Sequence, residues 1–456
     1  MKQSDTMSGC VRGSWIMSEY ADIMIRKLSL FSFRNYLSGD IVSLFFTERD
    51  YECIPNYIEY YDNEPYQYTK HIYKTTVKKA KERLDALGFS IFKFQKIFED
   101  NIADAVYFDY IFNCDTKTCT YEEMDISQVE KNITFKKWKN AIKKVIKYEL
   151  ENGNITGYNK VNGKGLNITT DCDRIVYNSL LHENNFEHYG LNTSVVPIEY
   201  SIRLMLEYCE PIDEILLDFS NFENWSEESI DWAKSATKAN EKTIVLVEGK
   251  NDKKILEFAL EKLYPHLSDL YYFMDFEDEY GGKRDGGTSY LIKNLKTFYF
   301  SRIRSKFIAI FDNDAEGYQS KCSLENDIKT WPDNFRILLY PSIKLFRSYP
   351  TILPDGKIYN DDINKKACSI ELYLPDKLIQ FNGKYYPIEW EERKKINKGN
   401  SVTEYRYQGV ISQKDVINKN FDVLYNKMQK GKLSFVAKEW DRMKQIIDTI
   451  VFAYAK

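Results

Sequence analysis

Two apolar, β-branched segments of this chain each end in acidic residues. They are TIVLVEGKND, from Thr243 to Asp252, and KFIAIFDNDAEG, from Lys306 to Gly317. Such segments are typical of buried parallel strands, and ligands of open α/β sheets bind outside the carboxyl ends of the strands. We therefore expect Glu248, Asp312 and Asp314 to converge. Carboxylates that lie together repel one another unless a cation compensates, and hard divalent metals prefer oxygen ligands. The two segments thus predict a metal-dependent phosphoryl-transfer site.

Each motif alone also has an ordinary structural interpretation. Asp312 could lie in a turn at the end of a strand, and Asp314 could cap the helix that follows. The order of elements is more specific than either motif. It comprises a strand with Glu-Gly, a helix (NDKKILEFALEKLY), a second strand (DLYYFMDF), a glycine-rich loop, a helix and a strand with Asp-x-Asp. This combination favours the catalytic interpretation.

The same order and spacing resemble the TOPRIM domain of topoisomerases, primases, a ribosomal-RNA maturase and OLD-family nucleases. The resemblance covers roughly Lys242 to Pro375. It implies that Glu248 is a general acid/base or metal ligand and that Asp312 and Asp314 are metal ligands. Asp252 completes an E-x-x-x-D motif that is similar to the nuclease branch of the family.

Four further positions follow from the same resemblance. Gly317 matches the glycine that usually follows Asp-x-Asp, and Gly249 permits a tight turn beside the glutamate. Glu371, in SIELYLPDKL, resembles a further acidic ligand of the OLD-like branch. Lys414, in QGVISQKDV, matches a downstream lysine that would neutralise charge developing on a phosphate. The implied cofactor is Mg²⁺ or Mn²⁺.

A glycine-rich loop, GGKRDGGTSYLIKNL, runs from Gly281 to Leu295. Its glycines permit positive φ, and Thr288 could cap the next helix. The loop could place backbone amides against phosphate oxygens, or it could be an ordinary connection. The expected substrate-binding residues are Gly249, Lys250, Gly282, Lys283, Arg284, Gly286 and Gly287.

Several segments together resemble the HEPN/Toprim-associated proteins of bacteria. These segments are GGTSYLIKNLK, FDNDAEG, ACSIELYLP and KEWDRMKQIIDTIV. The resemblance implies an OLD-like TOPRIM nuclease with a HEPN-like helical domain and a role in defence against phage. It also implies an ATPase partner, because this chain has no G-x-x-x-x-G-K-[ST] motif of its own.

Active HEPN ribonucleases carry R-x4–6-H on one helix. Here seven residues separate Arg174 from His182, so the motif is not matched, and we expect His182 and His188 to be structural or surface residues. The N-terminal half is therefore expected to be a scaffold, sensing or dimerisation module. A homodimer would form through this helical half.

Composition sets broader limits. The 456 residues favour two domains, and 43% hydrophobic with 29% charged residues is ordinary for a soluble globular protein. The net charge of −4 gives no global attraction for nucleic acid, although a local basic groove would suffice. None of the eight cysteines forms a C-x-x-C pair, which predicts reduced thiols in a cytoplasmic protein. No apolar stretch approaches the ~18 residues that span a bilayer.

The expected fold class is mixed, with a helical part and an α/β part. The expected divisions are a disordered extension (1–17), a mostly helical HEPN-like domain with a few N-terminal strands (18–238), a TOPRIM domain with a Rossmann-like parallel sheet covered by helices on both faces (239–378), and a C-terminal extension packed on it (379–456).

Individual elements can also be predicted. Residues 21–33 resemble a strand, and TKHIYKTTVKKAKERLDALG predicts a helix that ends at Gly88. A second helix, from Thr134 to Leu150, carries lysines that could contact phosphate or simply face solvent. Trp440 is expected on the buried side of a C-terminal helix.

Two functions remain open from the sequence. The first is a Mg²⁺- or Mn²⁺-dependent nuclease that hydrolyses phosphodiester bonds in DNA or RNA. The second is a non-catalytic nucleic-acid-binding or regulatory subunit with the same fold. A topoisomerase is disfavoured because no separate DNA-gate domain is evident, and a primase because no zinc-binding module is present.

Overall fold

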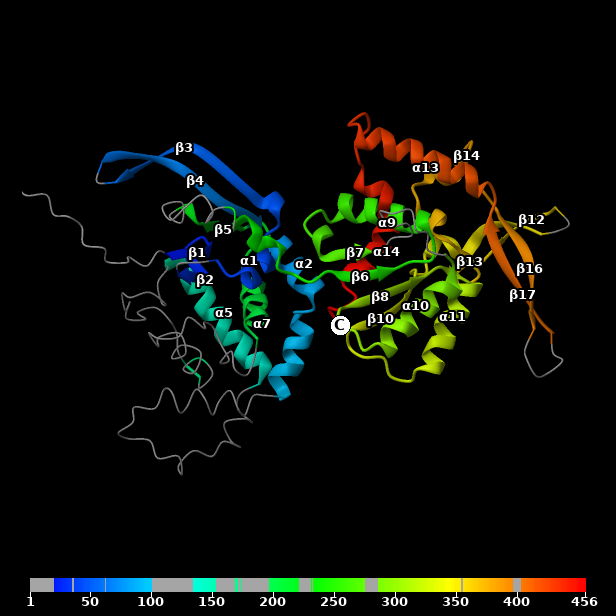
Figure 1. Ribbon diagram of the computed structural model, residues 1–456, viewed down its shortest axis with the longest axis horizontal. Helices are drawn as coiled ribbons and strands as arrows, with labels where there is room; N and C mark the ends of the chain where they lie inside the picture. The colour runs from blue at the N-terminus through cyan, green and yellow to red at the C-terminus, as the bar shows by residue number, and fades with distance from the viewer. Residues whose placement is uncertain are drawn as a thin grey trace, which may run out of the picture. The chain divides into compact units, whose positions relative to one another are not determined.

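A computed structural model gives the structure of this chain (Figure 1). The described residues are 20–34, 37–61, 63–100, 134–152, 169–170, 173, 197–220, 231, 233–274, 286–353, 356–396 and 403–456. The chain divides into two compact units. The first contains Met1–Lys81 and Gln95–Ala239, and the second contains Glu82–Phe94 and Asn240–Lys456. The short segment Glu82–Phe94 was not expected to belong with the C-terminal half.

The first unit contains a five-stranded antiparallel sheet with the order β2-β1-β5-β4-β3. The strands are β1 (Tyr20–Ile25), β2 (Leu28–Arg34), β3 (Tyr51–Tyr61), β4 (Glu64–Thr76) and β5 (Glu214–Asp218). The single strand predicted over 21–33 is therefore a hairpin, which turns at Arg26 with φ 52°. The sheet gives this unit more strand than the sequence pattern indicated.

The predicted helix that ends at Gly88 begins later than expected. Residues 69–76 belong to β4, and α2 covers only Val77–Leu87. The ladder from Ile72 to Thr76 pairs with β5, and this long-range pairing outweighs the local helical pattern. The predicted end is confirmed, because Gly88 follows the helix with φ +98°.

Further helices of the first unit include α1 (Gly39–Phe45), α5 (Phe135–Asn152) and α7 (Ile198–Met205). In α5, Trp138, Ile142 and Ile146 are buried, as predicted. Lys136 and Lys143 are exposed, so the lysine side faces solvent. The expected extension 1–17 and the residues Arg174, His182 and His188 lie outside the described residues.

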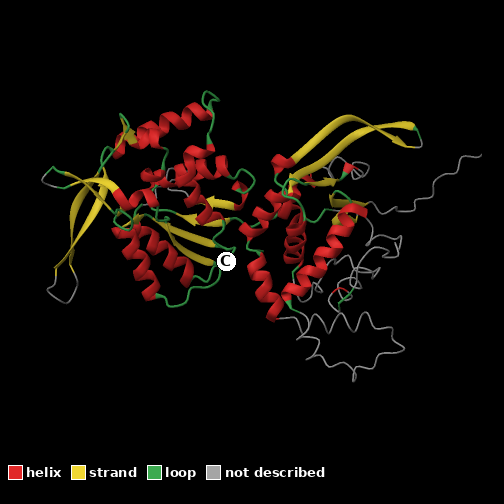
Figure 2. Cartoon of the chain, turned by 180° about the vertical axis from the view of Figure 1, so that it is seen from behind, coloured by secondary structure: helices red, strands yellow, loops and turns green. Residues whose placement is uncertain are grey.

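The second unit is built on the predicted parallel sheet, which the structure confirms. Its order is β10-β8-β6-β7, and every neighbouring pair is parallel. The strands are β6 (Thr243–Leu246), β7 (Tyr271–Phe273), β8 (Phe307–Phe311) and β10 (Phe335–Leu339). The connecting helices are α9 (Lys250–Leu263), α10 (Thr288–Phe300) and α11 (Ala315–Asp327). Figure 2 shows these helices around the strands.

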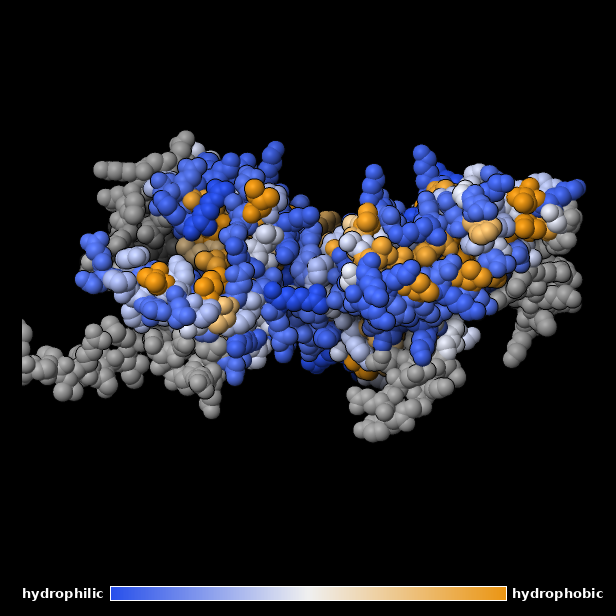
Figure 3. Space-filling model, turned by 90° about the horizontal axis from the view of Figure 1, so that it is seen from above, coloured by the Kyte–Doolittle hydropathy of each residue, from blue (hydrophilic) through white to orange (hydrophobic). Residues whose placement is uncertain are grey.

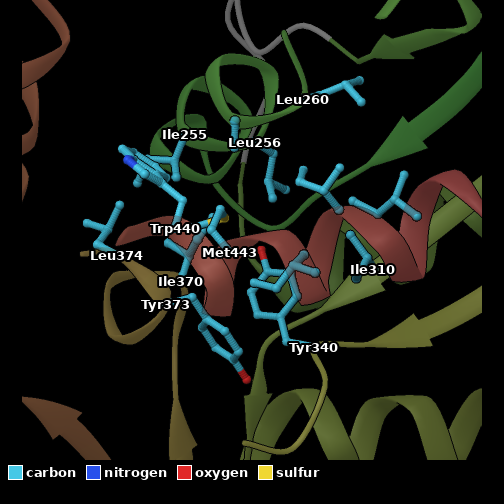
Figure 4. Packing of buried hydrophobic residues seen from close by; sticks show 14 of the residues in the cluster. Ile255, Leu256, Leu260, Ile310, Tyr340, Ile370, Tyr373, Leu374, Trp440 and Met443 are labelled. Carbon is cyan, nitrogen blue, oxygen red and sulfur yellow. The ribbon is translucent and has the colours of Figure 1, made fainter. Parts of the chain in front are cut away.

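Both faces of this sheet are buried. Successive side chains of β8 point to opposite faces, and each set joins a different hydrophobic cluster. Ile308 and Ile310 join a hydrophobic cluster with α9 and with α14 (Asp441–Val451). Phe307, Ala309 and Phe311 join a second cluster with α10 and α11. All five side chains are buried, as a continuous apolar run in a parallel sheet requires. Figure 4 shows the first cluster, in which Ile310 lies close to Tyr340.

The segment after residue 375 belongs to the same unit. Strands β11 (Tyr349–Ile352), β12 (Ile358–Asp361), β16 (Ile388–Ile396) and β17 (Thr403–Ile411) form a second sheet. The short strands β9 (Asn313–Asp314) and β13 (Ala367–Cys368) pair with each other, as do β14 (Gln380–Phe381) and β15 (Lys384–Tyr385). Helices α12 (Asp376–Ile379) and α13 (Lys414–Gln429) complete the segment. Trp440 is fully buried, as predicted.

Within the described part of the chain, no helix combines the length and the apolar character that crossing a membrane requires. Hydrophobic side chains on the face seen in Figure 3 are interspersed with hydrophilic ones. Among the described residues, exposed large hydrophobic side chains include Ile58 and Phe300.

Arg83 anchors the segment Glu82–Phe94 in the second unit. Its side chain is fully buried and donates hydrogen bonds to the His266 carbonyl oxygen and, at 2.8 and 3.0 Å, to the two carboxylate oxygens of Asp269. A bidentate guanidinium–carboxylate pair has a fixed geometry, so it orients this segment as well as stabilising it.

We expect Arg83→Met to destabilise the protein by about 2–3 kcal/mol, because it leaves the Asp269 carboxylate and a carbonyl without their donors. Thermal and urea unfolding would measure the change. Arg347→Met, at an exposed position, is the control and should have little effect. Equal stability of the two variants would contradict the anchoring role.

Candidate active site

Acidic side chains line a cavity at the carboxyl ends of β6 and β8. Its volume is about 350 Å³. The lining residues are Glu248, Gly249, Lys250, Asn251, Asp252, Asp312, Glu371 and Lys414. The structure thus brings together most of the residues to which the sequence assigned chemistry, from segments more than a hundred positions apart.

Glu248 follows β6 and is held by two donors. The Asp312 amide donates to Oε1 at 3.1 Å, and the Thr288 hydroxyl donates to Oε2 at 2.9 Å. The Gly287 amide also donates to the Glu248 carbonyl oxygen at 2.7 Å. These bonds fix the carboxylate between β8 and the start of α10.

The contact with Thr288 corrects an expectation. Thr288 was predicted to cap α10, but the helix is capped by Gly287, which has φ 89°. Thr288 is therefore the first helical residue, and its hydroxyl is directed at Glu248. The sequence shows that Gly287 precedes Thr288, but it does not show that the Thr288 hydroxyl bonds to Glu248.

Asp252 lies in the first turn of α9 and is almost completely buried. Its Oδ2 accepts a hydrogen bond from the Gly249 amide at 2.9 Å. An acidic residue at this helical position satisfies a donor that the helix itself leaves unpaired. The three-residue spacing between Gly249 and Asp252 allows this bond at the start of the helix. Asp252 also lines the cavity.

Asp312 follows β8, and its Oδ1 is buried without a hydrogen-bond partner in the described structure. A buried carboxylate oxygen without a donor is costly, so such an atom is evidence for a ligand that the protein is built to receive. Gly317 keeps this turn tight, because a Cβ at position 317 would lie 2.2 Å from the Asp312 carbonyl oxygen.

Glu371 and Lys414 also line the cavity. Glu371, in a 3₁₀ helix over Ile370–Tyr373, is almost fully buried. Its Oε2 accepts from the Ser369 hydroxyl at 2.7 Å, and its Oε1 lies 3.3 Å from Lys414 Nζ. Asn418 Nδ2 also donates to Oε1 at 3.3 Å. Asn418 and Ser369 were not identified from the sequence.

Asp314 does not line the cavity, although the sequence placed it with Glu248 and Asp312. It caps α11, where its Oδ1 accepts from the Gly317 amide at 2.7 Å. Its Oδ2 accepts from Gln408 Nε2 at 2.7 Å. Asp314 therefore occupies the helix-capping position that was the structural alternative for this residue. The unpaired amides at the start of α11 attract its carboxylate. Gln408 had no recognisable signal in the sequence.

The cavity disfavours negative charge. Burial, followed by the charges of Asp314 and Glu316, raises the pKa of Glu248 to about 7. Burial, followed by Glu371 and Glu248, raises the pKa of Asp252 to about 8.

Burial and neighbouring charges also shift the pKa values of Asp312 and Lys414. Burial and then Asp252 hold the pKa of Asp312 well above its ordinary value. Burial opposes the charge of Lys414, but Glu371 and Asp312 outweigh it and raise the pKa of the lysine. The carboxyl groups are thus shifted towards their neutral form, and the lysine is kept in its charged form.

The donor set suits a hard divalent metal. The carboxylates offer only oxygen, and one of those oxygens is the unpartnered Oδ1 of Asp312. Among the described residues, no three His, Cys, Asp or Glu side chains are already close enough to hold an ion together. Mg²⁺ usually keeps several waters and takes only one or two carboxylates directly.

The expected substrate-binding residues are only partly placed. Gly249 and Lys250 line the cavity, and the Gly249 amide is used by Asp252. Gly286 is exposed, and the Gly287 amide is bonded to Glu248. Gly282, Lys283 and Arg284 lie outside the described residues.

Comparison with known proteins bears on the first half of the chain. Residues 17–239 match the HEPN/Toprim N-terminal domain 1 family. This match supports the HEPN/Toprim association and indicates a nuclease-like or nucleic-acid-related role. It ends before Glu248, so it does not reach the cavity. No curated protein and no solved structure matches the chain.

We expect Asp252→Asn to raise the melting temperature by about 2–4 °C, which corresponds to about 1 kcal/mol in a domain of this size. Asparagine keeps an acceptor for the Gly249 amide but has no carboxyl group that burial, Glu371 and Glu248 force to take up a proton on folding.

The effect should depend on pH. A folded-state pKa of about 8 means that the native protein keeps a proton that the unfolded chain releases above about pH 4. Stability without divalent cations should therefore fall as pH rises from about 5 to 8, and the variant should fall less. Calorimetry in EDTA would measure this, and an equal or steeper fall in the variant would contradict it.

We expect Gly317→Ala to cost about 1–3 kcal/mol in stability, because the added methyl group overlaps the Asp312 backbone. Urea unfolding would measure the loss. Gly356→Ala, where nothing lies within 4 Å of the new atom but φ is +79°, measures the different cost of a left-handed backbone without crowding. Unchanged stability of Gly317→Ala would contradict the crowding argument.

Proposed function

We propose that this chain is a Mg²⁺- or Mn²⁺-dependent nuclease of the TOPRIM type, which hydrolyses phosphodiester bonds in DNA or RNA. One observation carries the proposal. Glu248, Asp252, Asp312 and Glu371 surround a single cavity together with Lys414, and one buried carboxylate oxygen there lacks a partner. The family match of the N-terminal half to a HEPN/Toprim domain supports nucleic acid as the substrate class.

Each side chain has a defined part in this proposal. Asp312 and one neighbouring carboxylate, Asp252 or Glu371, would hold the cation together with water molecules, and the cation when bound would polarise the phosphate and activate water. Glu248, with a pKa of about 7, can hold or release a proton near neutral pH, as general acid–base catalysis requires. Thr288 and the Asp312 amide orient its two oxygens.

Lys414 supplies positive charge to the same cavity. Its ammonium group is ion-paired with Glu371 and remains charged because the surrounding carboxylates raise its pKa. A cation at this position would bind a phosphate oxygen and stabilise the charge that develops on it. Asp314 acts indirectly here, since its bonds to Gly317 and Gln408 hold the turn that carries Asp312.

We further propose a role in defence against phage, together with an ATPase partner. The support is the resemblance to HEPN/Toprim-associated bacterial proteins and the family match over 17–239. The P-loop motif G-x-x-x-x-G-K-[ST] does not occur in this sequence.

A second candidate is a regulatory subunit that binds nucleic acid without cleaving it. The observation that favours it is the engagement of both Asp314 oxygens by hydrogen bonds, which leaves this carboxylate less open to a metal. Cleavage assays separate the two candidates directly.

We expect Asp312→Asn to lower cleavage roughly 100-fold or more, because one buried metal-binding oxygen is lost. Plasmid, single-stranded DNA and total RNA would be incubated with the full chain and Mg²⁺ or Mn²⁺. Asp327→Asn, which changes an exposed carboxylate on α11 that pairs with Lys296, should retain activity. Cleavage by Asp312→Asn at the unsubstituted rate would contradict the proposal.

Cation binding also has a readout that needs no substrate. We expect Mg²⁺ or Mn²⁺ to raise the melting temperature, because a ligand present at about 100 times its Kd stabilises the native state by about 2.7 kcal/mol. The increase should be smaller for Asp312→Asn than for Asp327→Asn. Equal increases would place the cation elsewhere.

A further inference from the structure

A second cavity, of about 440 Å³, lies close to the carboxylate cavity and differs from it in character. Its walls combine the aromatic side chains of Tyr318 and Trp390 with Leu353, with two lysines, Lys365 and Lys366, and with one carboxylate, Asp361. Tyr318 comes from the second turn of α11, and Trp390 comes from β16. Tyr318 and Leu353 are substantially exposed. The cavity therefore presents aromatic surface to solvent.

One wall pairs a cation with an aromatic ring. Lys365 Nζ lies 4.6 Å from the centroid of the Tyr318 ring. In the described part of the chain, no carboxylate lies within ion-pair distance of Lys365, whereas Lys366 pairs with Asp361 at 3.4 Å. Lys365 thus has charge to offer an anionic ligand, and the aromatic rings beside it have faces on which a flat ligand can stack.

The two cavities lie on either side of one short segment of chain. Asp312 lines the carboxylate cavity, and Ala315, three residues later, lines the aromatic one. Asp314, between them, forms a β-bridge with Lys366. Asn313 fixes the same junction, because its Oδ1 accepts a hydrogen bond from the Lys365 amide at 3.0 Å. A polymer whose phosphate occupied the first cavity would therefore reach the second with a neighbouring unit.

Close packing determines where Trp390 lies. It pairs with Gly409 of β17, and a Cβ at Gly409 would lie 2.6 Å from Ala367 Cβ and 3.1 Å from Trp390 Cζ3. Because Gly409 has no side chain, β17 can approach β13. Strand β17 contacts both β13 and α11. Figure 1 shows β13, β16 and β17 beside α11. The aromatic wall is thus built into the fold.

We propose that the aromatic cavity binds an unpaired nucleobase of the nucleic-acid substrate, next to the phosphate held at the carboxylates. The proposal rests on the proposed function and specifies its substrate as single-stranded at the bound position. An unpaired base can turn a face towards Tyr318 or Trp390, while Lys365 contacts its phosphate. A base within a duplex is already stacked and cannot do so without leaving its helix.

The proposal can be tested by binding alone. Fluorescence anisotropy with Ca²⁺ in place of Mg²⁺ would compare short single-stranded oligonucleotides, intact or abasic at each position in turn, and the corresponding duplex. The unsubstituted protein should bind one abasic oligonucleotide about 10-fold more weakly than the intact one, since stacking on an aromatic side chain has about this effect. It should also prefer the single strand over the duplex.

Substitutions then locate the effect. Tyr318→Leu should weaken binding of the intact oligonucleotide by about 10-fold and remove the discrimination against the abasic one. Phe300→Leu, at an exposed aromatic in the same unit, should change neither. Lys365→Gln should weaken all the oligonucleotides similarly and reduce the salt dependence of binding.

The outcomes are distinguishable from failure of the nuclease proposal. Equal affinity for intact and abasic oligonucleotides, or full discrimination by Tyr318→Leu, would overturn the nucleobase site even if Asp312→Asn abolished cleavage. Conversely, loss of discrimination in Tyr318→Leu would support the nucleobase site even if the chain cleaved nothing. Tighter binding of the duplex than of the single strand would also overturn it.

Discussion

The carboxylates gathered at one edge of the parallel sheet are the constraint on which the second unit depends. Their charges repel one another in a buried place, which raises the pKa values of Glu248 and Asp252. The fold offsets part of this cost with the Lys414 ammonium group and with donors from Gly249, Thr288 and the Asp312 backbone. Among the described residues of this site, the carboxylate oxygen without a hydrogen-bond partner belongs to Asp312. A bound cation would offset the repulsion that these groups leave.

The rest of the unit holds these groups in place against their repulsion. Both faces of the sheet are covered, so β6 and β8 deliver their acidic ends at fixed positions. The segment after residue 375 is part of the same construction. It contributes Lys414 to the wall of the cavity and Gln408 to the turn that carries Asp312. It also contributes α14, which packs on one face of the sheet. The site therefore depends on residues that lie well beyond the two acidic motifs.

Two neighbouring cavities of opposite character suit a polymer that carries both phosphates and bases. The acidic cavity would hold a phosphate through a cation, and the aromatic cavity offers rings and Lys365. The match of residues 17–239 to a HEPN/Toprim domain is consistent with such a ligand, although it concerns the other half of the chain. A net charge of −4 is no obstacle to the proposed binding, because the contacts would be local and the acidic cavity would act through a metal.

The sequence by itself determined the parallel strands, their connecting helices and the residues that would follow them. Apolar runs, helical periodicity and Gly88 are local signals, and local signals specify local elements. Pairing between distant segments was decided only in the tertiary structure. Because of this pairing, residues 69–76 form a strand instead of a helix, and the Thr288 hydroxyl donates to Glu248. Asp314 caps α11 and accepts a hydrogen bond from Gln408 instead of lining the cavity. These outcomes depend on neighbours that are remote in sequence, and a hydrogen-bonding group takes whichever partner the packed chain brings to it.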